Sequence, residues 1–180
     1  MMYVLPGTNI EVRELSYEAA ESLFNSIFLT GGLVLSQVSG MTDCAPHMIQ
    51  NWVKRGFVSP PVNKKYSKRQ FCRIVFISFL KEIMQIERVT ALMGYINGAL
   101  DDESDELVDD FTLYCYFIQV IGMLGDFKEE TVDRAVEEAI AGCDRFVHDR
   151  LRDTLRVMAT AYGASMLKMR TAMITNQLNL

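Results

Sequence analysis

The residues best suited to chemistry gather between positions 44 and 71. The window from Asn51 to Phe71 carries six cations and no acidic residue, although the whole chain has a net charge of -5. In and just before it, polar side chains recur at helical spacing: His47, Gln50, Asn51, Lys54 and Arg55. Gln and Asn can hydrogen-bond to adenine edges, and a cation that neutralises a phosphate releases counterions. This combination indicates contact with a polyanion such as double-stranded DNA.

The charge is distributed unevenly along the chain. Residues 1–43 have a net charge of -4, residues 44–100 a net charge of +7, and residues 101–180 a net charge of -8. A basic middle segment between acidic ends favours a surface in the middle that faces a polyanion. The alternative is a basic face that contacts only solvent, and charge alone does not distinguish between these two interpretations.

Other kinds of chemistry find little support in the sequence. Cys44 and His47 have a spacing compatible with metal ligation, but no second Cys/His pair accompanies them. The acidic run "DDESDELVDD" lacks the alternation and the glycine of a calcium loop. Phosphate-binding loops, nucleophile elbows and metalloprotease motifs are absent from the sequence. We therefore predict a protein that is not an enzyme and needs neither a metal nor a cofactor.

The elements that must position the polar and basic residues are almost all helical. Ser16 is expected to cap a helix that ends before Gly31-Gly32, and Ser36 to cap a short helix that reaches Met41. Thr42-Asp43 is expected to form a turn, followed by a second short helix from Pro46 to Arg55 that stops at Gly56. We expect Trp52 to anchor this second helix in the core.

A loop and two further helices are predicted next. Pro60-Pro61 forbids helix, so "FVSPPVNKKY" is expected to be an extended loop or a short ribbon. Ser67 and Gln70 fit a capping box that opens an apolar helix. A second amphipathic helix, in "QIERVTALMGYI", is expected to close at Asn97-Gly98.

The C-terminal region is predicted to add a buried helix, a shorter amphipathic helix in "EETVDRAVEEAIAG" and a long helix. "FTLYCYFIQVIGML" is apolar on every side, which is typical of a helix enclosed by the fold or by an oligomer. From Asp144 onward, apolar residues step by threes and fours as far as Met173. This stripe either packs against the Phe111–Leu124 helix or pairs two chains. We favour a homodimer through these helices, because recognition of two DNA half-sites normally needs two copies of the DNA-binding domain. The methionines at its end are expected to be core residues rather than the lining of a ligand pocket.

The order helix, tight turn, helix, basic loop and two helices resembles the DNA-binding domain of the MerR family from about Leu33 to Ile96. The motifs "NWVKRG", "PP" and "KKYS", and the acidic stretch before an apolar Tyr/Phe helix, are more similar still to a bacterial family known as domain of unknown function 1836. Both resemblances imply a winged helix-turn-helix that binds DNA.

The resemblance to MerR proteins also implies roles for single residues. Gln50 stands where those proteins usually place an arginine that contacts DNA, and Lys64 or Lys65 stands for a basic residue of the wing. Tyr66 matches the wing tyrosine that can reach the phosphate backbone. The chain departs from the pattern in two ways, since Gln50 removes a cation from the recognition helix and the wing is shorter.

The predicted fold is all-α, with a MerR-like winged helix-turn-helix followed by a C-terminal helical domain. Its expected parts are an N-terminal helical segment (1–32), the winged helix-turn-helix (33–98) and a helical domain for dimerisation or sensing (99–180). The predicted function is DNA binding in transcriptional control, with recognition helix 46–55 in the major groove and basic wing 63–69 on phosphates. The alternative is a winged-helix module that binds another protein and not DNA. The predicted DNA-binding residues are His47, Gln50, Asn51, Lys54, Arg55, Lys64, Lys65, Tyr66, Lys68 and Arg69.

The expected location is the cytoplasm. No stretch approaches the roughly 20 apolar residues of a membrane span, and the N-terminus lacks the features of a signal peptide. The four cysteines have no paired spacing, which suits thiols in a reducing compartment. Double-stranded DNA is the expected partner, no contact with a membrane is expected, and the sequence specifies no small-molecule effector.

Overall fold

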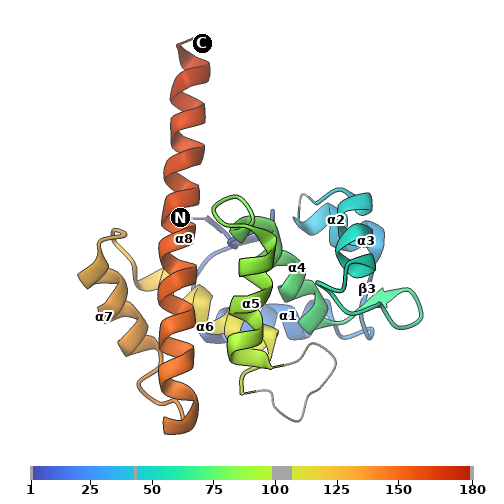
Figure 1. Ribbon diagram of the computed structural model, residues 1–180, viewed down its shortest axis with the longest axis horizontal. Helices are drawn as coiled ribbons and strands as arrows, with labels where there is room; N and C mark the ends of the chain where they lie inside the picture. The colour runs from blue at the N-terminus through green and yellow to red at the C-terminus, as the bar shows by residue number, and fades with distance from the viewer. Residues whose placement is uncertain (1, 43, 99–106, 179–180) are drawn as a thin grey trace.

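The computed structural model describes residues 2–42, 44–98 and 107–178, and these residues form a mostly helical protein (Figure 1). Asp43, which is predicted to lie in a turn, and most of the acidic run, in residues 99–106, lie outside the described residues. The helices are α1 (Tyr17–Ile27), α2 (Leu35–Thr42), α3 (Pro46–Lys54), α4 (Lys68–Leu80), α5 (Ile86–Asn97), α6 (Asp110–Met123), α7 (Glu129–Ala139) and α8 (Arg145–Gln177). Two small antiparallel sheets accompany them: β1 (Tyr3–Val4) pairs with β2 (Glu11–Val12), and β3 (Leu33–Val34) pairs with β4 (Lys65–Tyr66).

Local signals fix most of the helix ends. Ser16 caps α1 by accepting a hydrogen bond from the backbone N–H of Ala19, and Ser67 and Gln70 form the expected capping box at the start of α4. Pro46 occupies the first turn of α3, and Gly56 follows that helix with φ +75°. The expected cap at Ser36 is wrong, because α2 already begins at Leu35. There the Gln37 side chain accepts a hydrogen bond from the backbone N–H of Val34.

Helix α6 lies at the centre of the core, as its all-round apolar sequence predicts. Its residues Leu113, Tyr114, Phe117 and Ile118 are completely buried. It packs against α1, α4, α7 and α8, so one continuous hydrophobic cluster runs from the N-terminal segment to α8. The Tyr114 hydroxyl donates a hydrogen bond to the Pro6 carbonyl at 2.9 Å and so ties the N-terminal loop to this centre.

A buried polar group joins three of the helices. Arg73 of α4 donates to the Asp110 carboxylate of α6 at 2.7 Å, and Asn97 of α5 donates to the same carboxylate at 2.6 Å. Burial raises the pKa of Asp110, while the positive charge of Arg73 acts in the opposite direction. The arrangement specifies how the head of the protein (residues 33–98) packs on α6, because a different register would bury one of the two charges without its partner.

The long helix α8 begins inside the fold and ends outside it. Leu151, Leu155 and Met158 are completely buried, so the first half packs as an ordinary core helix. The last turns project beyond the rest of the molecule (Figure 1). The expectation that the methionines at this end are core residues is wrong for Met166, Met169 and Met173, which are exposed. None of the helices in the described ranges combines the length and the apolar character needed to cross a membrane.

Candidate nucleic-acid interface

Helices α2 and α3 pack against each other at the end of the molecule farthest from α7 and α8 (Figure 1). Ile49 and Trp52 turn the apolar side of α3 into the core, where they are 0% and 4% exposed. The Lys81 ammonium group lies 5.1 Å from the centre of the Trp52 ring and makes a cation–π contact with it. Trp52 is therefore the core anchor that the sequence indicates.

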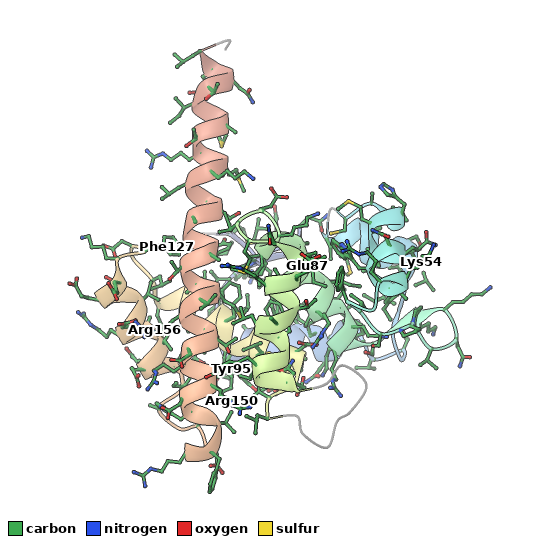
Figure 2. The ribbon with its side chains drawn as sticks, viewed as in Figure 1. Lys54, Glu87, Tyr95, Phe127, Arg150 and Arg156 are labelled. Atoms are coloured by element: carbon green, nitrogen blue, oxygen red, sulfur yellow. The ribbon has the colours of Figure 1, made fainter. Side chains whose placement is uncertain are left out.

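The opposite side of α3 is polar and open to solvent. His47, Gln50, Asn51 and Lys54 are all exposed, and their spacing of three and four residues places them on one face of the helix. Figure 2 shows Lys54 at the outer side of this end of the molecule. Because Ile49 and Trp52 hold the other face, the polar face stays open and can approach a large ligand.

Arg55, just after α3, has partners within the protein. Its guanidinium donates to the Glu87 carboxylate of α5 at 3.1 Å and lies 4.5 Å from the centre of the Phe57 ring. Both side chains of the ion pair are about half exposed or more, so the pair is screened by solvent and can exchange for a phosphate. This role of Glu87 was not predictable from the sequence, because Glu87 lies 32 residues away from Arg55 along the chain.

The basic loop forms a short ribbon that ends in a tight hairpin. Val62 and Lys65 exchange two backbone hydrogen bonds, at 3.1 and 2.9 Å, across a two-residue turn. The turn residues Asn63 and Lys64 have φ angles of +51° and +62°. Positive φ at both positions is typical of the turn type that best fits the twist of a hairpin. The turn places the Lys64 side chain, which is exposed, at the outer end of the ribbon.

Tyr66 does not match its predicted role. Its side chain is 3% exposed and belongs to the hydrophobic core, and burial raises the pKa of its hydroxyl. The reason lies in the pairing of β3 with β4. Tyr66 is paired with Leu33, and both residues point into the core. Tyr66 is therefore a core residue, and the prediction that it contacts a phosphate is wrong.

Lys68 is half-buried and has partners within the protein. Its ammonium group donates to the Asn25 side chain at 2.7 Å and lies 3.7 Å from the centre of the Phe111 ring. These contacts link the start of α4 to α1 and α6, so Lys68 is a structural cation. Lys65 is exposed and donates to the Thr30 carbonyl at 3.3 Å, and Arg69 is half-buried.

The structure thus divides the predicted residues into two groups. The first group is exposed on α3, directly after it, or on the hairpin: His47, Gln50, Asn51, Lys54, Arg55, Lys64 and Lys65. The second group is less accessible: Tyr66 is buried, and Lys68 and Arg69 are half-buried. Among the described residues, no group of three or more His, Cys, Asp or Glu side chains is placed to hold a metal ion.

These features define a mostly helical protein with a polar helix and a basic hairpin at one end. The chain belongs to the family described as Domain of unknown function (DUF1836), which matches residues 25–117. The matched range runs from α1 to the middle of α6. It therefore contains the polar helix, the hairpin and the buried contact between Arg73 and Asp110.

Comparison with curated proteins gives one relative. The chain is 29% identical over 84 residues to the uncharacterized protein YkrK of Bacillus subtilis (strain 168). The match covers 44% of this chain and 36% of YkrK, so the similarity spans about a third of that relative's length. No solved structure matches the chain significantly.

Proposed function

We propose that the protein binds double-stranded DNA through a MerR-like winged helix-turn-helix and regulates transcription. In this proposal α3 enters the major groove, which is wide enough to accept a helix. Gln50 and Asn51 face the base edges, while Lys54 and Arg55 lie near the phosphates. Lys64 and Lys65, on the hairpin, contact the backbone beside the groove.

The observation that carries the proposal is the exposure of Gln50, Asn51 and Lys54 on one face of α3. Had the acidic C-terminal half covered these residues, a protein-binding module or an autoinhibited regulator would be the better interpretation. Instead α3 lies at the opposite end of the molecule from α7 and α8 (Figure 1). A helix held by its apolar side, with amide and cationic groups facing outward, suits a DNA groove.

Binding to random-sequence duplex DNA at low salt tests the proposal, with fluorescence anisotropy as the measurement. We expect the wild-type chain to bind with an affinity that falls as salt rises, because bound lysines displace counterions. Lys54→Ala and Lys64→Ala should each weaken binding and reduce the slope of log affinity against log salt by about one.

The control is Lys128→Ala. Lys128 is exposed, pairs with Asp126 and lies at the start of α7, far from the head. This variant should bind as the wild type does. No binding by the wild type, or equal losses in all three variants, would contradict the proposal and favour a module that binds another protein.

A further inference from the structure

A regular row of residues runs along the solvent face of α8. Its members alternate in steps of three and four and are all exposed: Val157, Thr160, Ala164, Leu167, Thr171, Ile174 and Leu178, here called the seam. The four large apolar members, Val157, Leu167, Ile174 and Leu178, are 41%, 63%, 49% and 62% exposed. An average step of 3.5 residues over three repeats is the signature of a helix that pairs with another helix in a left-handed coiled coil.

The seam is separate from the buried side of α8. Thr160 follows Leu151, a fully buried residue, by nine residues, which is about two and a half turns and puts the two on opposite sides of the helix. The row of residues on the buried side begins with Leu151, Leu155 and Met158. Farther along α8 the same row continues with Met166, Met169 and Met173, which are exposed. The seam, in contrast, is exposed over its whole length of about 32 Å, both beside the body of the protein and beyond it.

The projecting end of α8 is a helix that needs a partner. Residues 166–178, here called the tip, include Met166, Leu167, Met169, Met173, Ile174 and Leu178, all exposed. At its base, Lys168 pairs with Glu82 at 2.9 Å. A single helix of this length is marginally stable in water unless an apolar face is covered.

The same chain carries a groove around the first half of the seam. The groove has a volume of about 670 Å³, and Val157, Thr160 and Ala164 form part of its floor. Phe127 flanks it on one side, where it packs against Gly163, and Ile83 and Met84 contribute further apolar lining. Its lining therefore suits an apolar helix.

Groove and tip also have opposite charges. The tip contains Lys168 and Arg170 and no acidic residue. The groove includes Glu129, Asp133 and Asp153 alongside Arg156, and α7 as a whole has five acidic residues and one arginine. Lys168 and Arg170 flank the seam at the positions that usually carry charge in coiled coils.

We infer that the seam binds a second copy of this chain, with the two α8 helices antiparallel. In this arrangement Val157 meets Ile174 of the other copy, Thr160 meets Thr171, and Ala164 meets Leu167. Each of these pairs occurs twice because the interface is symmetric. The tip of each copy lies over the groove of the other. Lys168 and Arg170 of the tip thereby approach the acidic residues of that groove. Self-pairing accounts for the tip, the groove and their charges together, whereas an unrelated partner seated in the groove would leave the tip uncovered.

Pairing through the seam does not depend on the proposed DNA binding. The seam contains none of the residues proposed to bind DNA, and α8 lies far from α3 in the molecule (Figure 1). The oligomeric state and DNA binding are therefore tested by separate measurements.

The mass of the full chain in solution tests the inference. Sedimentation equilibrium should give twice the chain mass of 20.5 kDa for the wild type. Ile174→Glu should give the single mass, because the seam would then bury two carboxylates. Met173→Glu is the control, since Met173 is also exposed on the tip but lies outside the seam, and this variant should remain a dimer. A monomeric wild type, or a monomeric Met173→Glu variant, would overturn the inference.

Cysteine cross-linking tests the direction of pairing. In a Cys143→Ser background, where Cys44, Cys72 and Cys115 are buried, Thr160→Cys and Thr171→Cys are introduced together. Under mild oxidation the double variant should form a covalent dimer, while each single variant should stay uncross-linked. Efficient cross-linking of the Thr160→Cys single variant would indicate parallel helices and contradict the antiparallel arrangement. Both positions are exposed, so folding is expected to be unaffected.

Discussion

Lys64 has a backbone conformation that ordinarily favours glycine. Its φ angle of +62° follows another positive angle at Asn63, and the commonest sequence for such a turn is Asn-Gly. A side chain in this conformation costs about 1–2 kcal/mol. A cation is therefore present at the outer end of the hairpin at the expense of stability, as expected if its charge has a function.

Stability and DNA binding should respond to Lys64→Gly in opposite directions. We expect the free energy of unfolding to rise by about 1 kcal/mol, because glycine adopts this conformation without a steric penalty. DNA affinity should fall, because a cation is lost. Urea denaturation and anisotropy measure the two effects.

Asn63→Gly is the control for Lys64→Gly. It removes a side chain from the same turn and leaves the charge in place. Its DNA affinity should therefore equal that of the wild type. Unchanged DNA affinity in Lys64→Gly would remove Lys64 from the interface.

At the scale of helices, the ion pair between Arg73 and Asp110 decides how the head joins the rest of the protein. Both side chains are less than 10% exposed, and Asn97 adds a third helix to the contact. A cation in the middle of an apolar helix is a poor core residue by itself. It is accommodated here because α6 supplies a carboxylate opposite it.

Removing one partner of this pair should be far more damaging than removing both. We expect Arg73→Met to lower the free energy of unfolding by about 3–5 kcal/mol, because Asp110 would remain buried without its cation, with only Asn97 donating to it. The double variant Arg73→Met/Asp110→Leu should recover much of that loss. Chemical denaturation of both variants measures the difference. Equal destabilisation of the single and double variants would show that the pair does not couple the helices in this way.

At the scale of the whole molecule, pairing through α8 should make thermal stability depend on concentration. The melting temperature of the wild type should rise with protein concentration, because mass action favours the folded dimer. Ile174→Glu should melt at a temperature independent of concentration, while Met173→Glu should behave as the wild type does. Differential scanning fluorimetry over a hundredfold range of concentration measures the effect. A melting temperature of the wild type that stays constant over this range would argue against the dimer.

The sequence by itself determined the features that depend on a few neighbouring residues. Ser16 and the pair Ser67 and Gln70 cap their helices as expected, because a cap is made within one turn of chain. Gly56 and Gly98 have the positive φ angles expected where helices stop. The burial of α6 was also predictable, since a helix that is apolar on all sides must be enclosed.

Only the tertiary structure decided which side chains of the basic segment face outward. Lys64 and Lys68 look alike in the sequence, yet Lys64 is exposed and Lys68 is half-buried against Asn25 and Phe111, each 43 residues away along the chain. Tyr66 is buried because β4 pairs with β3, which turns its ring into the core. Likewise, only the tertiary structure shows that Met166, Met169 and Met173 are exposed. Helical spacing shows that residues share a face, but whether that face is buried depends on how the rest of the chain packs against it.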